Sequence, residues 1–149
     1  MEISDALKLI DRINNLPEIY DQIERAVIAT MHSYYSEILN IEMEEAKIME
    51  GEDYNHDELA PLIENKKSIH EKYWSNPAGF YQPCSSSSSP DHIWNNLSSI
   101  EILQNGDDEL PLFLFKANYT DQDINLTTNR AYLLKLRGTQ LKIEHTFFG

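Results

Sequence analysis

Carboxylates crowd one segment of this sequence. Between residues 37 and 58 the chain has nine acids and one base, Lys47, within a formal net charge of −13. Such a segment can be a solvated helix surface, or it can attract and steer a basic protein partner. A surface that serves only solubility usually intersperses both signs of charge, which supports docking, but the residue types alone slightly favour a solvated surface. The nine acids are Glu37, Glu42, Glu44, Glu45, Glu50, Glu52, Asp53, Asp57 and Glu58.

The histidines offer less chemistry. None of the five stands four residues from another, the spacing of a helical metal site, so no metal is expected. His145 follows Glu144 on a predicted strand, where neighbouring side chains point to opposite faces, so these two cannot form a simple catalytic pair. We expect His145 to share a face with Ile143 and Phe147 as a hydrogen-bonded core residue. No catalytic residue is predicted, and the chain is not expected to be an enzyme.

Other composition features narrow the function further. The single cysteine, Cys84, rules out an internal disulfide framework and a cysteine-rich zinc site, which favours a reducing compartment. No glycine-rich phosphate loop is present, and no cofactor is expected. Strong negative charge repels phosphate backbones and anionic lipids, so neither nucleic acid nor a membrane is an expected partner. The first residues do not resemble a secretory signal, and no apolar run approaches about 18 residues, so a soluble cytoplasmic protein is expected.

Helical periodicity dominates the first half. Ser4 is predicted to cap a short first helix, which Pro17 separates from the next one. Apolar residues then recur at spacings of three and four from Ile19 to Ile41 and indicate an unusually long amphipathic helix that ends near Glu50. Asp57 is predicted to cap a third helix that ends at about residue 75.

Strand patterns replace helical ones in the second half. A loop covers residues 76–92 and includes five consecutive serines, with a short helical turn predicted around 91–94. Strands follow from Ile100, at 112–119, at 126–136 and at 141–147, joined by turns that include Gly106 and Gly138. Short turns make neighbouring strands antiparallel. We therefore predict one α+β domain, 1–149, with a helical part at about 3–75 and a sheet part at about 98–148.

Two motifs resemble a known family. The predicted last hairpin, Tyr132 to Ile143, resembles the closing strand pair of the nuclear-transport-factor-2-like superfamily, with Leu141 where a Trp is common. The run from Tyr73 to Pro83, an aromatic residue followed by Tyr-x-Pro before the sheet, resembles the bacterial immunity proteins of that superfamily. The resemblance implies helices packed on a curved antiparallel sheet, a cone-like fold. It also implies a function, the binding and neutralising of a cognate bacterial toxin.

Combined with the acidity, the resemblance predicts a basic toxin, such as a nuclease, as the partner. An alternative is a small-molecule-binding or isomerase/dehydratase-like enzyme that uses the interior of the cone, and a third is a general charged interaction domain. The state of the interior separates the first two, because an enzyme needs polar groups converging on a pocket. The predicted partner-binding residues are Glu37, Glu42, Glu44, Glu45, Glu52, Asp53, Tyr54, Phe80 and Tyr81.

Overall fold

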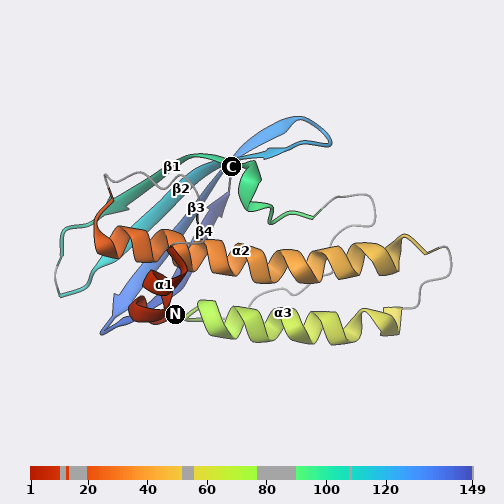
Figure 1. The fold of residues 1–149 in the computed structure, drawn as a ribbon, viewed down its shortest axis with the longest axis horizontal. Coiled ribbons are helices and arrows are strands. Elements are labelled where there is room, and N and C mark those ends of the chain that lie inside the picture. Colours follow the sequence, from red (N-terminus) through yellow and green to blue (C-terminus); the bar gives the residue numbers. More distant parts are fainter. Residues whose placement is uncertain (11–12, 14–19, 52–55, 77–89, 108, 149) are drawn as a thin grey trace.

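Helices precede strands in the described part of the chain, as predicted. The computed structural model describes residues 1–149 except 11–12, 14–19, 52–55, 77–89, 108 and 149. Its described part packs three helices against a four-stranded, curved antiparallel sheet (Figure 1), which confirms the predicted α+β class. The helices are α1 (Ile3–Leu9), α2 (Gln22–Met49) and α3 (Ala60–Tyr73), with 3-10 turns η2 (His56–Glu58) and η3 (Trp94–Asn96). The strands are β1 (Leu97–Gln104), β2 (Leu112–Asp121), β3 (Leu126–Arg137) and β4 (Gln140–Phe148).

The long helix α2 begins at a well-formed cap. The Asp21 carboxylate accepts a hydrogen bond from the Glu24 backbone N–H at 2.8 Å, and the Glu24 side chain accepts one from the Asp21 N–H at 3.1 Å. This reciprocal pair satisfies two of the donors that a helix start leaves free. The helix then runs to Met49, which confirms the predicted end near Glu50, but it begins at Gln22, later than the apolar pattern from Ile19 indicated.

The predicted caps of the two shorter helices are wrong. Ser4 lies inside α1, whose N-cap is Glu2, because Ile3 donates its N–H to the Thr139 carbonyl and the chain enters the helix from an extended segment beside the β3–β4 turn. Asp57 lies in η2 instead of capping α3, which follows from Leu59 with a proline in its first turn.

The sheet is a meander in the order β1-β2-β3-β4, with all neighbours antiparallel. Gly138, with φ +63°, turns β3 into β4, a conformation that residues with a Cβ adopt at a cost. Two register shifts interrupt the ladders, one after Ser98 in β1 and one between Leu133 and Leu134 in the pairing of β3 with β4. Each extra residue turns the side chains beyond it to the opposite face.

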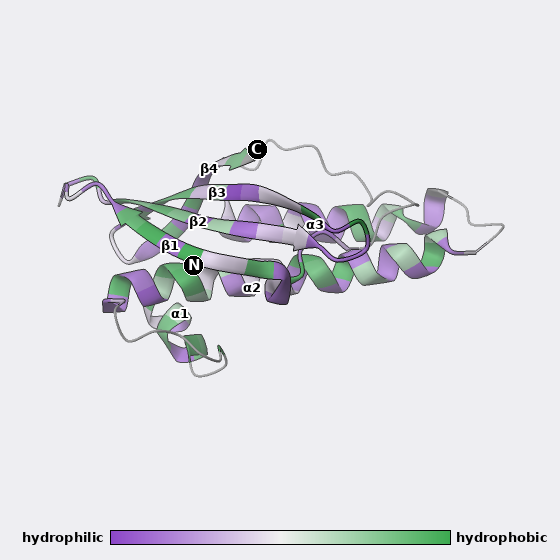
Figure 2. Cartoon of the chain, turned by 90° about the horizontal axis from the view of Figure 1, so that it is seen from above, coloured by the Kyte–Doolittle hydropathy of each residue, from purple (hydrophilic) through white to green (hydrophobic). Residues whose placement is uncertain are grey.

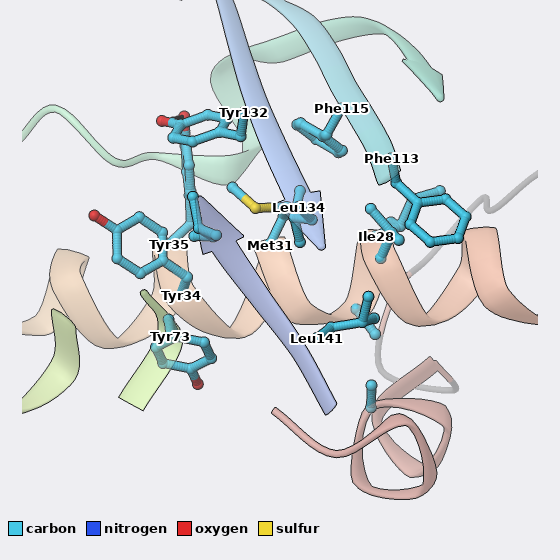
Figure 3. Packing of buried hydrophobic residues seen from close by; sticks show 14 of the residues in the cluster. Ile28, Met31, Tyr34, Tyr35, Tyr73, Phe113, Phe115, Tyr132, Leu134 and Leu141 are labelled. Carbon is cyan, nitrogen blue, oxygen red and sulfur yellow. Dashed lines mark hydrogen bonds between the residues drawn. The ribbon is translucent and has the colours of Figure 1, made fainter. Parts of the chain in front are cut away.

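One face of the sheet packs on α2, and α3 lies alongside α2 (Figures 1 and 2). The main core fills the space between α2 and the sheet (Figure 3). A second, smaller core lies between α2 and α3, in the part of this helical hairpin that projects beyond the sheet (Figure 1). Buried members of the main core include Ile28, Met31, Tyr35, Phe113, Phe115, Tyr132, Leu134 and Leu141, and those of the second are Ile41, Leu59 and Leu62.

Candidate functional site

The predicted partner-binding residues divide into two groups. Four lie on α2: Glu44 is exposed, Glu37 is partly exposed and pairs with Lys72 of α3 at 3.2 Å, and Glu42 and Glu45 are buried. The other five lie outside the residues that the structure describes, namely Glu52, Asp53, Tyr54, Phe80 and Tyr81. Their role in partner binding stays a prediction.

Glu42 and Glu45 correct the expectation of one exposed acidic row. They are 4% and 0% exposed, because each stands four residues after a buried isoleucine, Ile38 or Ile41, and so falls on the same face of α2. Replacing either one with lysine would therefore place an ammonium group inside the protein instead of changing its surface. The buried face of α2 contains the apolar residues predicted for it, and it also includes these two glutamates.

Glu45 forms an ion pair inside the helical hairpin. The Lys66 Nζ of α3 lies 2.6 Å from the Glu45 Oε1, and the two side chains are 8% and 0% exposed. Lys66 follows Leu62 by one helical turn, so its sequence position on the apolar face of α3 was a readable signal of burial. The pair joins α2 to α3 in the half of the hairpin that holds the second core.

Glu42 anchors the chain segment that leads into η3. Its two carboxylate oxygens accept the backbone N–H groups of Asp91 and His92 at 3.1 and 3.0 Å, and the His92 Nδ1 donates to it at 3.1 Å. Burial raises the pKa of Glu42, but the hydrogen bond and charge of His92 and the Asp91 N–H outweigh it and hold this pKa below its ordinary value. The segment is thereby fixed to α2 immediately before the sheet begins.

The same segment is held from the sheet side by Arg130 of β3. The guanidinium donates from Nη2 to the Asp91 carboxylate and from Nη1 to the Asp91 carbonyl, both at 2.7 Å, and it lies 3.6 Å from the centre of the Tyr119 ring. Nη1 also donates to the Tyr35 hydroxyl at 3.1 Å, which in turn lies 2.8 Å from the Tyr132 hydroxyl. Sequence reasoning missed Arg130, although strand alternation with Tyr132 and Leu134 placed it inward.

Two histidines, His32 and His70, are partly buried on the helices. The His70 Nδ1 lies 2.9 Å from the Lys66 carbonyl, which can only accept, so this nitrogen carries a proton and the Nε2 accepts from the Tyr34 hydroxyl at 3.1 Å. Burial lowers the pKa of His70, and it also lowers that of His32. Both rings therefore favour the neutral form more strongly than a histidine in water.

His145 does not lie where the sequence placed it. The shift of register in the β3–β4 pairing separates it from buried Ile143, so that it sits opposite Leu133, exposed, with its ring 4.7 Å from that of Phe147. Glu144, at the shift, accepts a hydrogen bond from the Ser75 hydroxyl at 2.7 Å. The predicted core histidine is thus a surface residue, because one additional residue in the pairing exchanges the two faces.

Side chains fill the space between α2 and the sheet. The centre of the Tyr132 ring lies 6.1 Å from that of Tyr35 and 6.3 Å from that of Phe115. The Trp94 ring packs against both Tyr35 and Phe115. Two hollows lined by described residues are small and open to the surface: about 280 Å³ between the helices near Glu37, and about 270 Å³ over β1–β3 near Lys116. Within the described residues no group of three or more potential metal ligands converges.

The projecting end of the α2–α3 hairpin carries five exposed acids. We call this region the acidic hairpin end; it comprises the last turns of α2, η2 and the first turns of α3 (Figure 1). Two exposed lysines, Lys47 and Lys67, are the bases on this region. Its exposed acids are Glu44, Glu50, Asp57, Glu58 and Glu64.

Comparisons with protein-family models, with curated proteins and with solved structures gave no match to this chain. The resemblance to the nuclear-transport-factor-2-like superfamily, and to its immunity-protein branch, therefore stays a prediction from two sequence motifs. Among the described helices, none has the length and apolarity required to cross a bilayer.

Proposed function

We propose that this protein is an immunity-type inhibitor that binds a basic bacterial toxin, such as a nuclease, through the acidic hairpin end. One observation carries the proposal: five exposed carboxylates and two exposed ammonium groups occupy a helical hairpin that projects beyond the sheet. A nuclease binds phosphates in a basic cleft, so a projecting element with excess negative charge can take the place of its substrate. Attraction between the two surfaces would also accelerate their encounter.

The hairpin suits this role because it is built to be rigid. Its own small core of Ile41, Leu59 and Leu62 and the Glu45–Lys66 ion pair hold the two helices together away from the sheet. A charged element that is already ordered loses less conformational entropy when it binds, which favours affinity. The buried acids thus support the surface acids instead of contacting the partner themselves.

The enzyme alternative receives less support from the same geometry. Where a cone-shaped enzyme would need an open cavity, the aromatic rings of α2 and of the sheet pack against one another. His145, the residue weighed as a base, is exposed on the opposite face of the sheet beside Phe147. Binding through the outer surface of the hairpin makes no use of an interior site.

The direct test is protection of a bacterial host. The toxin for this test is to be sought as the small C-terminal domain of a large secreted protein encoded by the adjacent upstream gene. Growth of cells that express this domain should be restored by co-expression of the present chain, and the two purified proteins should form a complex. A domain that stays lethal in the presence of well-expressed, folded chain would overturn the proposed function.

The surface assignment has its own test. Replacing Glu44, Glu50 and Glu64 with lysine should slow association with that domain by about tenfold or more and flatten its dependence on salt. The control reverses three exposed acids on and around the sheet, which changes net charge equally but leaves the hairpin intact: Glu101, Glu109 and Asp123. Equal effects of the two triple variants would show that net charge alone matters and that the hairpin end is not the contact surface.

A further inference from the structure

Arg130 keeps a permanent positive charge inside the protein. The residue is 5% exposed, and a guanidinium cannot lose its proton at physiological pH. A buried charge is tolerated when hydrogen bonds and an opposite charge offset its loss of water. The groups around Arg130 therefore define a site that requires an anion.

Uncharged groups orient the guanidinium of Arg130, in addition to the Asp91 carboxylate. The Tyr119 ring covers its face at 3.6 Å, and the Tyr35 hydroxyl and the Asp91 carbonyl accept from Nη1 at 3.1 and 2.7 Å. A further contact, from Nη2 to the Asp91 Oδ1 at 2.7 Å, is made by a carboxylate. A guanidinium held in this way presents a fixed donor to a carboxylate oxygen.

The two members of this ion pair differ in their exposure. The Asp91 side chain is 59% exposed and the Arg130 side chain 5% exposed, so the carboxylate reaches the buried cation from the surface. If Asp91 swung away it would be hydrated, whereas Arg130 would be left without this anion. The backbone of the segment would stay in place, because Glu42 binds the N–H groups of Asp91 and His92.

We propose that Arg130, Tyr35 and Tyr119 form a binding site for a small carboxylate, which Asp91 occupies from within the chain. A free carboxylic acid enters by taking the position of the Asp91 Oδ1 on Nη2. Because Asp91 is tethered beside the site, its effective concentration is in the range of millimolar or higher, and simple carboxylates compete poorly with it. The site is independent of the acidic hairpin end and of any toxin.

Truncating Asp91 opens the site to a probe. In the full-length Asp91→Ala variant, sodium formate should raise the melting temperature saturably, by about 3–6 °C at about ten times its dissociation constant, while sodium chloride at equal ionic strength should not. Asp91→Ser, a second truncation, should respond in the same way. The wild-type protein should respond little, because its own carboxylate fills the site.

Asp91→Asn is the matched control. It removes the same negative charge as Asp91→Ala but keeps an oxygen of the same reach beside Nη2, so formate should stabilise it far less. A formate response that is equal in the alanine and asparagine variants, or equal to that of chloride, would reduce the effect to general electrostatics and overturn the site. Absence of a response in both truncations, with the protein folded by circular dichroism, would overturn it as well.

Discussion

The Glu45–Lys66 pair allows a sharp test of what holds the projecting hairpin together. Lys66→Met would leave the fully buried Glu45 carboxylate without the ammonium that lies 2.6 Å from it. Removing one member of a buried pair destabilises a protein by about 3–5 kcal/mol. For a domain of this size that corresponds to a fall in melting temperature of about 6–20 °C.

The chain offers a matched control for this prediction. Lys72 is also on α3 and also pairs with a glutamate of α2, Glu37, at 3.2 Å, but the two side chains are 53% and 37% exposed. Lys72→Met should therefore lower the free energy of unfolding by only about 0–1 kcal/mol. Urea denaturation followed by circular dichroism measures the unfolding free energy of both variants. The slope of this free energy against urea concentration should not change.

A double variant separates charge from packing. Glu45→Leu combined with Lys66→Met replaces the pair by apolar side chains, and its stability should return to that of the wild type or exceed it by about 1–4 kcal/mol. The coupling energy between the two residues is the stability change of the double variant minus the sum of the changes in the single variants Glu45→Leu and Lys66→Met. Comparable small losses for Lys66→Met and Lys72→Met, or a double variant no better than the single one, would refute the view that Lys66 and Glu45 form a desolvated pair.

Four further outcomes follow from the interior. The pKa of Glu42 in the folded protein lies below its ordinary value of 4.5. The stability that this carboxylate contributes is therefore present above pH 4.5 and is lost as the pH falls through the lower, folded-state pKa. Glu42→Gln should weaken the dependence of the unfolding free energy on pH below 4.5. Burial lowers the pKa of His70, so the free energy of unfolding falls as the pH drops below the ordinary value of about 6.5, and His70→Gln should reduce this dependence in urea unfolding below that pH. Tyr132→Phe removes the hydroxyl contact with Tyr35 and should cost about 1 kcal/mol in urea unfolding, a loss that would be absent if the contact were immaterial. Gly138→Ala introduces a Cβ at φ +63° and should cost about 1–2 kcal/mol, whereas an unchanged midpoint would show that the turn relaxes freely.

Local sequence patterns were sufficient to predict most of the fold. The run of apolar residues at spacings of three and four gave the long helix, and alternation with turn residues near Gly106 and Gly138 gave the antiparallel meander. These signals are strong because each residue reports on its own neighbours along the chain. Helix caps were predicted less well: Ser4 and Asp57 have the right side chains, but α1 begins earlier, where Ile3 donates to the Thr139 carbonyl, and α3 begins later, after Leu59.

The candidate site was predicted only in part. Glu44 is exposed as expected, whereas Glu42 and Glu45 lie on the buried face of α2. Their partners come from distant segments: His92 is 50 residues from Glu42, and Lys66 is 21 residues from Glu45. Sequence spacing along one helix cannot reveal such partners. The exposed position of His145 likewise depends on a shift in strand pairing that no local pattern encodes.

The sequence by itself determined the α+β class, the order of the elements and the concentration of negative charge on residues 37–58, which cover the second half of α2 and the connection to α3. These are properties of periodicity and composition, which act over a few residues. The tertiary structure alone decided which acids remain in water and which are paired inside, and it brought Arg130 against Asp91 and Tyr35. The physical reason is that a charged side chain is buried only where a partner from another element offsets its desolvation, and that partner is chosen by the packing of the whole chain.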